Sequence, residues 1–296
     1  MSRYINPFTD TGFKIIFGKE NQSEFLLKNF LNELFNGQPD FENIVSLSYI
    51  NNERSRDNQY GKTIIHDIIC TTDKGNRFIV EMQKEAKEDF LYRSTYYLCR
   101  GVTDQVKIAS RHMSRGYHYL PVVGVFICDF TIKGMDKELV NHYMLTNTHT
   151  GKPLSSFIRC CYLQLPVFEK SWEECLTKFE QWVFILKNMY RMKEFPNLTR
   201  KDEVFSRLEE VASYASMSEE ERVAYEADLR WASEYEEEMR TARHMAAEEG
   251  RAEGRAEGRA EEKNNIARNL LHSGALDITA ISEITGLSIE EIQSLQ

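Results

Sequence analysis

Three residues in the stretch 64–83, Asp67, Glu81 and Gln83, have the side chains and spacing for hydrolytic chemistry. The two acids lie inside apolar runs, where a charge is costly unless it is paired or bound to a cation. Two neighbouring carboxylates repel each other, which favours a hard divalent cation such as Mg²⁺ between them. That cation could polarise a phosphodiester and lower the pKa of a bound water, which Gln83 could orient. The alternative is a hairpin with edge-exposed carboxylates, and spacing alone does not choose between the two.

Whether the three side chains converge depends on the register of a predicted β-hairpin. Two apolar, β-branched runs flank a cluster of turn-forming residues at 73–76. A three-residue loop, Asp73 to Gly75, would set Asp67 opposite Glu81, and Gln83 would share their face. A two-residue loop would send Asp67 to the opposite face. The chemistry therefore requires a loop of odd length, or a bulge with the same effect.

Four further residues are candidates to support this site. Arg93 and Tyr97 stand at i and i+4 on a helix predicted from about 89 to 111. Arg93 could contact a phosphate, and Tyr97 could support the site. Alternatively, Tyr97 is a packing residue and Arg93 is a solvated surface residue. Asp10 and Glu53 could complete a metal shell, although capping a helix or closing a loop is the simpler role for each. Gly101 is a weak point within the helix.

The elements that would position these residues follow the order α-β-β-β-α-β-β-α. Hydrophobic periodicity predicts helices at about 23–34, 89–111 and 171–193 and strands at 44–50, in the hairpin, and at 121–128 and 157–165. Residues 131–152 are polar and loop-like. The pattern predicts an α/β fold with a central mixed β-sheet flanked by helices, in a domain of residues 1–195.

The rest of the chain is predicted to be an all-helical C-terminal extension, with an acidic part at 196–262 and a small module at 263–296. A tandem Glu-Gly-Arg-Ala repeat at 249–261 places like charges at i and i+4, and each glycine weakens a helix by about 1 kcal/mol. We therefore expect a semi-flexible spacer, or a coil that becomes firm in a homo-oligomer. The terminal helical pair has a helix-turn-helix outline, but two glutamates in its last helix repel phosphate. A packing or dimerisation module fits better.

Charge and composition permit nucleic-acid binding without arguing for it. The 296-residue chain has a formal net charge of −9, but residues 201–262 hold 19 acidic and 9 basic residues, which leaves a net charge of +1 elsewhere. Residues 84–119 carry 7 Lys and Arg against 4 Asp and Glu. No apolar run of membrane-spanning length and no secretory signal is visible, and the six cysteines lack disulfide spacing. We expect a cytoplasmic protein with reduced thiols.

Several ordered blocks make residues 5–190 resemble one protein family. They are Asp10 to Gly18, Asn32 to Phe35, Tyr49 to Glu53, Asp67-Ile68, Gly75 to Gln83, Phe90 to Tyr97, Gln105 and Tyr117. Together they resemble the Rpn family of bacterial recombination-promoting nucleases, or transposases, of the PD-(D/E)xK superfamily. The resemblance implies a restriction-endonuclease-like core and a metal-dependent DNA endonuclease.

Carried over residue by residue, the resemblance makes Asp67 and Glu81 the metal-binding pair. It places Gln83 where the wider superfamily has its catalytic lysine, and glutamine is usual there in this family. At Gln164 and Val167 the chain departs from the acidic residue and lysine that the family tends to have.

The leading hypothesis is a Mg²⁺-dependent DNA endonuclease that promotes recombination. The rival hypothesis is a non-catalytic interaction or regulatory protein, or a degenerate transposon product, that uses the acidic tail for partners. RNA as the substrate also stays open.

Overall fold

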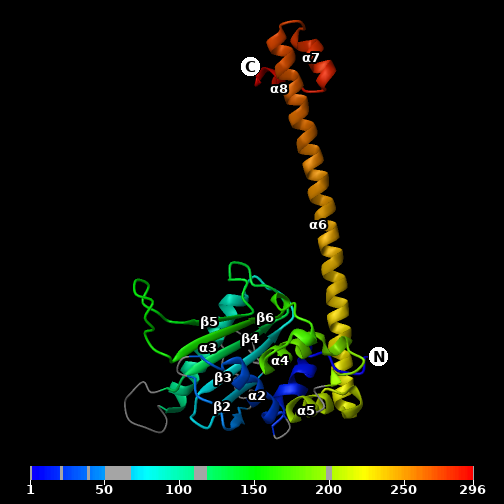
Figure 1. Cartoon of the computed structure of the whole chain (residues 1–296). Coiled ribbons are helices and arrows are strands. Elements are labelled where there is room, and N and C mark those ends of the chain that lie inside the picture. The colour runs from blue at the N-terminus through cyan, green and yellow to red at the C-terminus, as the bar shows by residue number, and fades with distance from the viewer. Residues whose placement is uncertain are drawn as a thin grey trace. The chain divides into compact units, whose positions relative to one another are not determined.

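The computed structural model describes residues 2–20, 23–38, 41–50, 68–109, 119–197 and 202–295. Its contacts divide the chain into two compact units, Met1–Leu229 and Arg230–Gln296. The first unit is built on a mixed six-stranded sheet with helices packed on both faces, as Figure 1 shows. The predicted α/β class with a central mixed sheet and a helical C-terminal extension is confirmed.

The sheet has the strand order β1-β2-β3-β4-β6-β5. Its strands are β1 (Leu47–Tyr49), β2 (Ile68–Thr72), β3 (Arg77–Gln83), β4 (Val122–Cys128), β5 (Val140–Met144) and β6 (Ile158–Gln164). The three neighbours β3, β4 and β6 are parallel, and the other pairings are antiparallel. β4 is buried along its whole length, because helices cover both faces of the parallel strands.

The β2–β3 hairpin has the predicted register. Thr72 N–H donates to Asn76 C=O at 2.9 Å, so the loop consists of the three residues Asp73 to Gly75. The described ladder runs from Thr71 opposite Arg77 to Ile68 opposite Val80. Two of the candidate residues, Glu53 and Asp67, lie outside the described residues.

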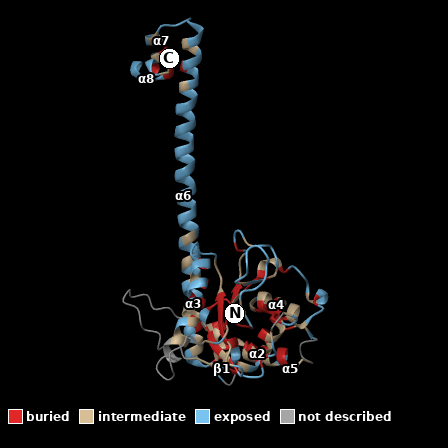
Figure 2. Ribbon diagram, turned by 90° about the vertical axis from the view of Figure 1, so that its left-hand side faces the viewer, coloured by how far each residue is buried: buried red, intermediate tan, exposed pale blue. Residues whose placement is uncertain are grey.

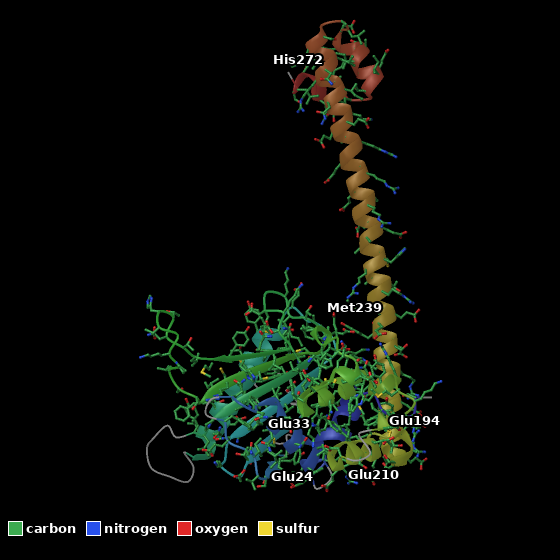
Figure 3. All side chains as sticks on the ribbon, viewed as in Figure 1. Glu24, Glu33, Glu194, Glu210, Met239 and His272 are labelled. Carbon is green, nitrogen blue, oxygen red and sulfur yellow. The ribbon has the colours of Figure 1, made fainter. Side chains whose placement is uncertain are left out.

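The helices of the first unit lie in two layers. One face of the sheet is covered by α3 (Phe90–Ala109), and the other by α2 (Glu24–Leu34), α4 (Lys178–Asn188) and α5 (Glu203–Val211). Glu24, labelled in Figure 3, ties α2 to the sheet because its carboxylate accepts a 3.0 Å hydrogen bond from Leu47 N–H. Short helical segments complete the unit: α1 (Asp10–Phe13), a π-helix (Lys14–Gly18) and 3₁₀ turns at Leu165–Val167, Trp172–Glu174, Met189–Arg191 and Tyr214–Ser216.

Some of the predicted elements were wrong or misplaced. Residues 131–152 were expected to be a loop, but they contain β5. This edge strand is only partly buried, and it is held by pairing with β6. The strand predicted at 44–50 shrinks to β1, and the helix predicted at 171–193 divides into two 3₁₀ turns and α4.

The long helix α6 (Glu219–Ser273) begins in the first unit and ends in the second. The Glu-Gly-Arg-Ala repeat, predicted as a spacer or coil, is helical, and Figure 2 shows this part of α6 exposed. In the second unit, α7 (Ile278–Thr285) and α8 (Ile289–Gln293) pack with the end of α6 around Ala267, Ile281 and Ile292. The end of α6 and the two terminal helices therefore share a small apolar core. Of the helices that the structure describes, none combines the length and apolar composition that crossing a membrane requires.

Candidate functional site

The candidate site lies on β3, on the side of the sheet that α3 covers. Alternation along the strand turns Phe78, Val80 and Met82 into the main core, and it turns Ile79 and Glu81 toward α3. The side chain of Glu81 is buried, with 2% of the residue's surface exposed. Gln83, two residues further on, donates from Nε2 to Glu81 Oε2 at 3.4 Å. The structure thus brings together two of the three residues predicted to carry the chemistry.

Gly101 sets how closely α3 approaches the sheet. A Cβ atom at this position would lie 2.8 Å from Val122 Cγ1 and 3.1 Å from Ile79 Cδ1. The carbonyl of Gly101 also accepts a 3.1 Å hydrogen bond from Arg77 Nη1, on β3. The predicted weak point of the helix is therefore a place where α3 packs tightly against the strands.

Arg93 and Tyr97 face the acid from α3. Arg93 Nη2 donates to Tyr97 Oη at 3.2 Å, and the guanidinium carbon lies 5.8 Å from the centre of the tyrosine ring. Burial pulls the pKa of Arg93 down. The hydrogen bond to Tyr97 and the charges of Tyr97, Asp89 and Glu81 outweigh that effect, so the pKa is raised. Arg93 is therefore a fixed positive charge within electrostatic reach of Glu81.

Asp10 has a different environment from the one proposed for it. It begins α1 and forms a 2.8 Å ion pair with Lys14, one turn further along the chain. The helix cap is supplied by its neighbour Thr9, whose side chain accepts a hydrogen bond from Gly12 N–H. Asp10 is thus an exposed residue that is paired locally with Lys14.

Gln164, noted in the sequence as a departure from the family pattern, has a structural role that the sequence did not reveal. Its buried side chain accepts a 2.7 Å hydrogen bond from Ile132 N–H and donates to the carbonyls of Asp136 at 2.8 Å and Glu138 at 3.1 Å. These bonds hold the segment before β5. Ile132 packs in the same apolar cluster as Tyr97, so Gln164 also supports the surroundings of the candidate site.

The described donors suit a hard cation but do not complete a metal site. The carboxylate of Glu81 and the amide oxygen of Gln83 are oxygen ligands, the type that Mg²⁺ prefers. Within the described ranges, no three His, Cys, Asp or Glu side chains form a group that could hold a metal ion. A site that holds a metal ion with Glu81 and two more such side chains therefore needs at least one of them from outside those ranges.

Comparison with known proteins adds one match. Residues 7–242 match the family described as PD-(D/E)XK nuclease family transposase, a span that contains the whole sheet, α3 and the candidate site. No curated protein and no solved structure shows significant similarity to the chain.

Proposed function

Because the chain belongs to the PD-(D/E)XK nuclease family transposases, we propose that it is a divalent-metal-dependent DNA endonuclease that promotes recombination. The observation that carries the proposal is the buried carboxylate of Glu81 on a central strand, with the Gln83 amide beside it and the Arg93 cation facing it. A carboxylate is rarely buried unless it is paired with a charge or binds a cation.

The proposed second metal ligand is Asp67. The described ladder steps evenly from Thr71 opposite Arg77 to Ile68 opposite Val80. One further step in this register is Asp67 opposite Glu81. Opposed residues of an antiparallel pair point to the same face, so the two carboxylates would meet. The odd-length loop supports this pairing, because a two-residue loop would have separated the two acids.

In the proposed mechanism each residue has a separate task. Asp67 and Glu81 would hold the divalent cation, which when bound would polarise the phosphodiester and lower the pKa of a bound water. Gln83 orients the attacking water through its amide, which has both a donor and an acceptor. Arg93, held by Tyr97, contacts the phosphate and offsets the negative charge that develops on it. Glutamine is neutral, so Arg93 supplies the positive charge that a lysine at position 83 would have supplied.

The test is nicking of supercoiled plasmid by the purified full chain with Mg²⁺, with Glu81→Gln and Asp67→Asn as variants. Glu138→Gln, an exposed carboxylate on the segment before β5, is the matched control. We expect each site variant to nick the plasmid at least about 100-fold more slowly, since mutation of residues that only support metal ligands already lowers activity by up to that factor. EDTA should abolish nicking by the unchanged protein.

Three outcomes would contradict the proposal. Nicking by both site variants at the rate of the control would remove Asp67 and Glu81 from the mechanism. Absence of nicking with every divalent cation and DNA form would favour a non-catalytic interaction protein. A parallel reaction with RNA of the same sequence tests the identity of the substrate. Cleavage of RNA but not of DNA would show that RNA is the substrate instead. Circular dichroism of each variant checks that the fold is retained.

A further inference from the structure

The outer face of α3 carries two exposed tyrosines beside the candidate site. Ser94, Tyr97 and Leu98 are buried on the inner face of this helix. Tyr92 and Tyr96 stand at i and i+4, so they share the opposite face, and 81% and 41% of their surfaces are exposed. The Tyr92 ring in particular contributes little to the core. The packing of the fold therefore does not account for an aromatic side chain at this position.

A cation adjoins these tyrosines within one turn of the helix. The guanidinium carbon of Arg93 lies 5.8 Å from the ring centre of Tyr97, and the ring centre of Tyr96 lies 6.5 Å from that same point. The cation and an exposed ring thus flank one buried ring. Residues 90–103 contain two arginines and no acidic residue, so this part of α3 has a positive formal charge.

Buried contacts fix this part of α3 on the sheet. Ser94 Oγ donates to Leu91 C=O at 2.9 Å, so its single proton is used, and it accepts from the hydroxyl of Tyr162 at 2.7 Å. Tyr162 lies on β6, and its ring also contacts the ring of Phe90, with the two centres 6.0 Å apart. The outer face of these turns is therefore held in place, which lowers the ordering cost of binding a ligand there.

The side chains on this face match the two parts of a nucleotide. An arginine binds a phosphate through charge-assisted hydrogen bonds, and an exposed tyrosine ring stacks on a base. A base inside a duplex is already stacked between its neighbours, so only an unpaired base could use these rings. A purely apolar partner would cover the rings but would bring no charge for Arg93. The cation together with the exposed rings favours an unpaired nucleotide as the occupant.

We propose that Tyr92, Tyr96 and Arg93 bind an unpaired nucleotide of a single-stranded nucleic acid, with the base on the tyrosine rings and the phosphate at Arg93. The proposal rests on the proposed function for the role of Arg93, and it adds a class of substrate: a strand that is single or locally opened. Because Arg93 and Tyr97 face Glu81 from α3, the bound phosphate would lie on the side of the candidate site.

The test measures binding in EDTA, so it does not depend on cleavage. The full chain is titrated into a fluorescent oligothymidine strand, or into a duplex of the same length, and fluorescence anisotropy gives the Kd. The double variant Tyr92→Ala with Tyr96→Ala removes both rings. The double variant Tyr92→Phe with Tyr96→Phe is the matched control, because it keeps the rings and removes only the hydroxyls. Both positions are exposed, and circular dichroism checks that each variant keeps the fold.

The unchanged protein should bind the single strand more tightly than the duplex. The alanine variant should bind the single strand about 5-fold to 150-fold more weakly, the loss expected when an aromatic side chain that stacks on one base is removed. The phenylalanine variant should bind as the unchanged protein does. Neither variant removes a charge, so the slope of log K against log salt should stay the same in both. Arg93→Gln should reduce the magnitude of that slope by about 0.7.

Cys99 gives a second readout on the same face. It stands three residues after Tyr96, and it is exposed, whereas the other five cysteines are buried or half-buried. Bound oligothymidine should slow the alkylation of Cys99 by iodoacetamide in the unchanged protein and in the phenylalanine variant, but not in the alanine variant. Shielding of Cys99 that needs no DNA and grows with protein concentration would show that a second copy of the chain covers this face, and would overturn the proposal.

Four further results would overturn the proposal. They are equal affinity of the alanine variant and the unchanged protein for the single strand, an equal loss in the phenylalanine variant, binding to the duplex that is as tight as binding to the single strand, and no binding to either. Failure of the proposed function looks different. Binding with the expected pattern by a protein that nicks nothing would retain this site and reject the catalytic function, whereas nicking by a protein whose alanine variant binds normally would do the reverse.

Discussion

Replacing Gly101 with alanine tests whether contact with the sheet fixes the position of α3. Alanine favours an exposed helix over glycine by about 1 kcal/mol. At this position, however, the new methyl group would lie 2.8 Å from Val122 Cγ1, and Val122 is buried on a central strand with little freedom to move. Inserting a methyl group into a packed core costs about 1–3 kcal/mol. We expect Gly101→Ala to lower the free energy of unfolding by about 1 kcal/mol.

A double-mutant cycle with Val122→Ala isolates the cause. Val122→Ala alone should cost about 2 kcal/mol, because it leaves a cavity. In the double variant the new methyl group at 101 enters that cavity. The double variant should therefore lose at least about 1 kcal/mol less free energy of unfolding than the two single variants lose in sum. The assay is urea unfolding followed by tryptophan fluorescence, to which the fully buried Trp182 contributes from the first unit.

Gly254 provides the reference for helix propensity. A Cβ atom there would have nothing within 4 Å. Gly254→Ala should therefore only stabilise α6, by about 1 kcal/mol. The measurement is amide hydrogen exchange, which should become slower around residue 254. If the losses of Gly101→Ala and Val122→Ala add within about 0.5 kcal/mol, the proposed contact does not determine the position of α3. Stabilisation by Gly101→Ala would refute the reasoning directly.

Three further substitutions probe other parts of the molecule. Gln164→Glu sets a buried carboxyl against the Asp136 and Glu138 carbonyls, so its folded pKa should rise above about 4.3. Its stability relative to the unchanged protein should then fall as pH rises, by up to about 1.4 kcal/mol per unit, and equal losses in urea unfolding at acidic and alkaline pH would contradict this. Tyr97→Phe removes the oxygen that accepts from Arg93 and should cost about 1 kcal/mol in the same assay, whereas no loss would mean that the bond is immaterial. Ser288→Ala breaks the capping box of α8 and should cost the terminal module about 0.5–2 kcal/mol; unchanged hydrogen exchange in α8 would show that the cap is dispensable.

The hairpin and the order of the main elements could be predicted because their causes are local. Turn-forming residues at 73–76 and the two-residue period of a strand determine which side chains share a face, and the structure confirms the register over the described pairs. α3 and β4 were also recognisable from period and composition. The pairing of Asp67 with Glu81 stays a prediction.

The features that were missed depend on residues distant in the sequence. β5 carries polar residues at an edge and is a strand because β6 pairs with it. The role of Gln164 depends on backbone groups about thirty residues earlier in the chain.

The three-residue hairpin loop limits how this chain can vary in length. Gly75 has a φ of +82°, and an added Cβ there would lie 2.4 Å from Leu120 Cδ1, so the loop is constrained in shape as well as in count. Insertion or deletion of a single residue between Thr72 and Asn76 would shift the register by one residue, so every side chain of one strand would point to the opposite face of the sheet. A substitution within a strand affects only one side chain. A chain that retains Asp67 and Glu81 can thus lose their pairing through a change in length alone. Relatives that keep both acids are expected to differ in the loop's residues but to retain its odd length.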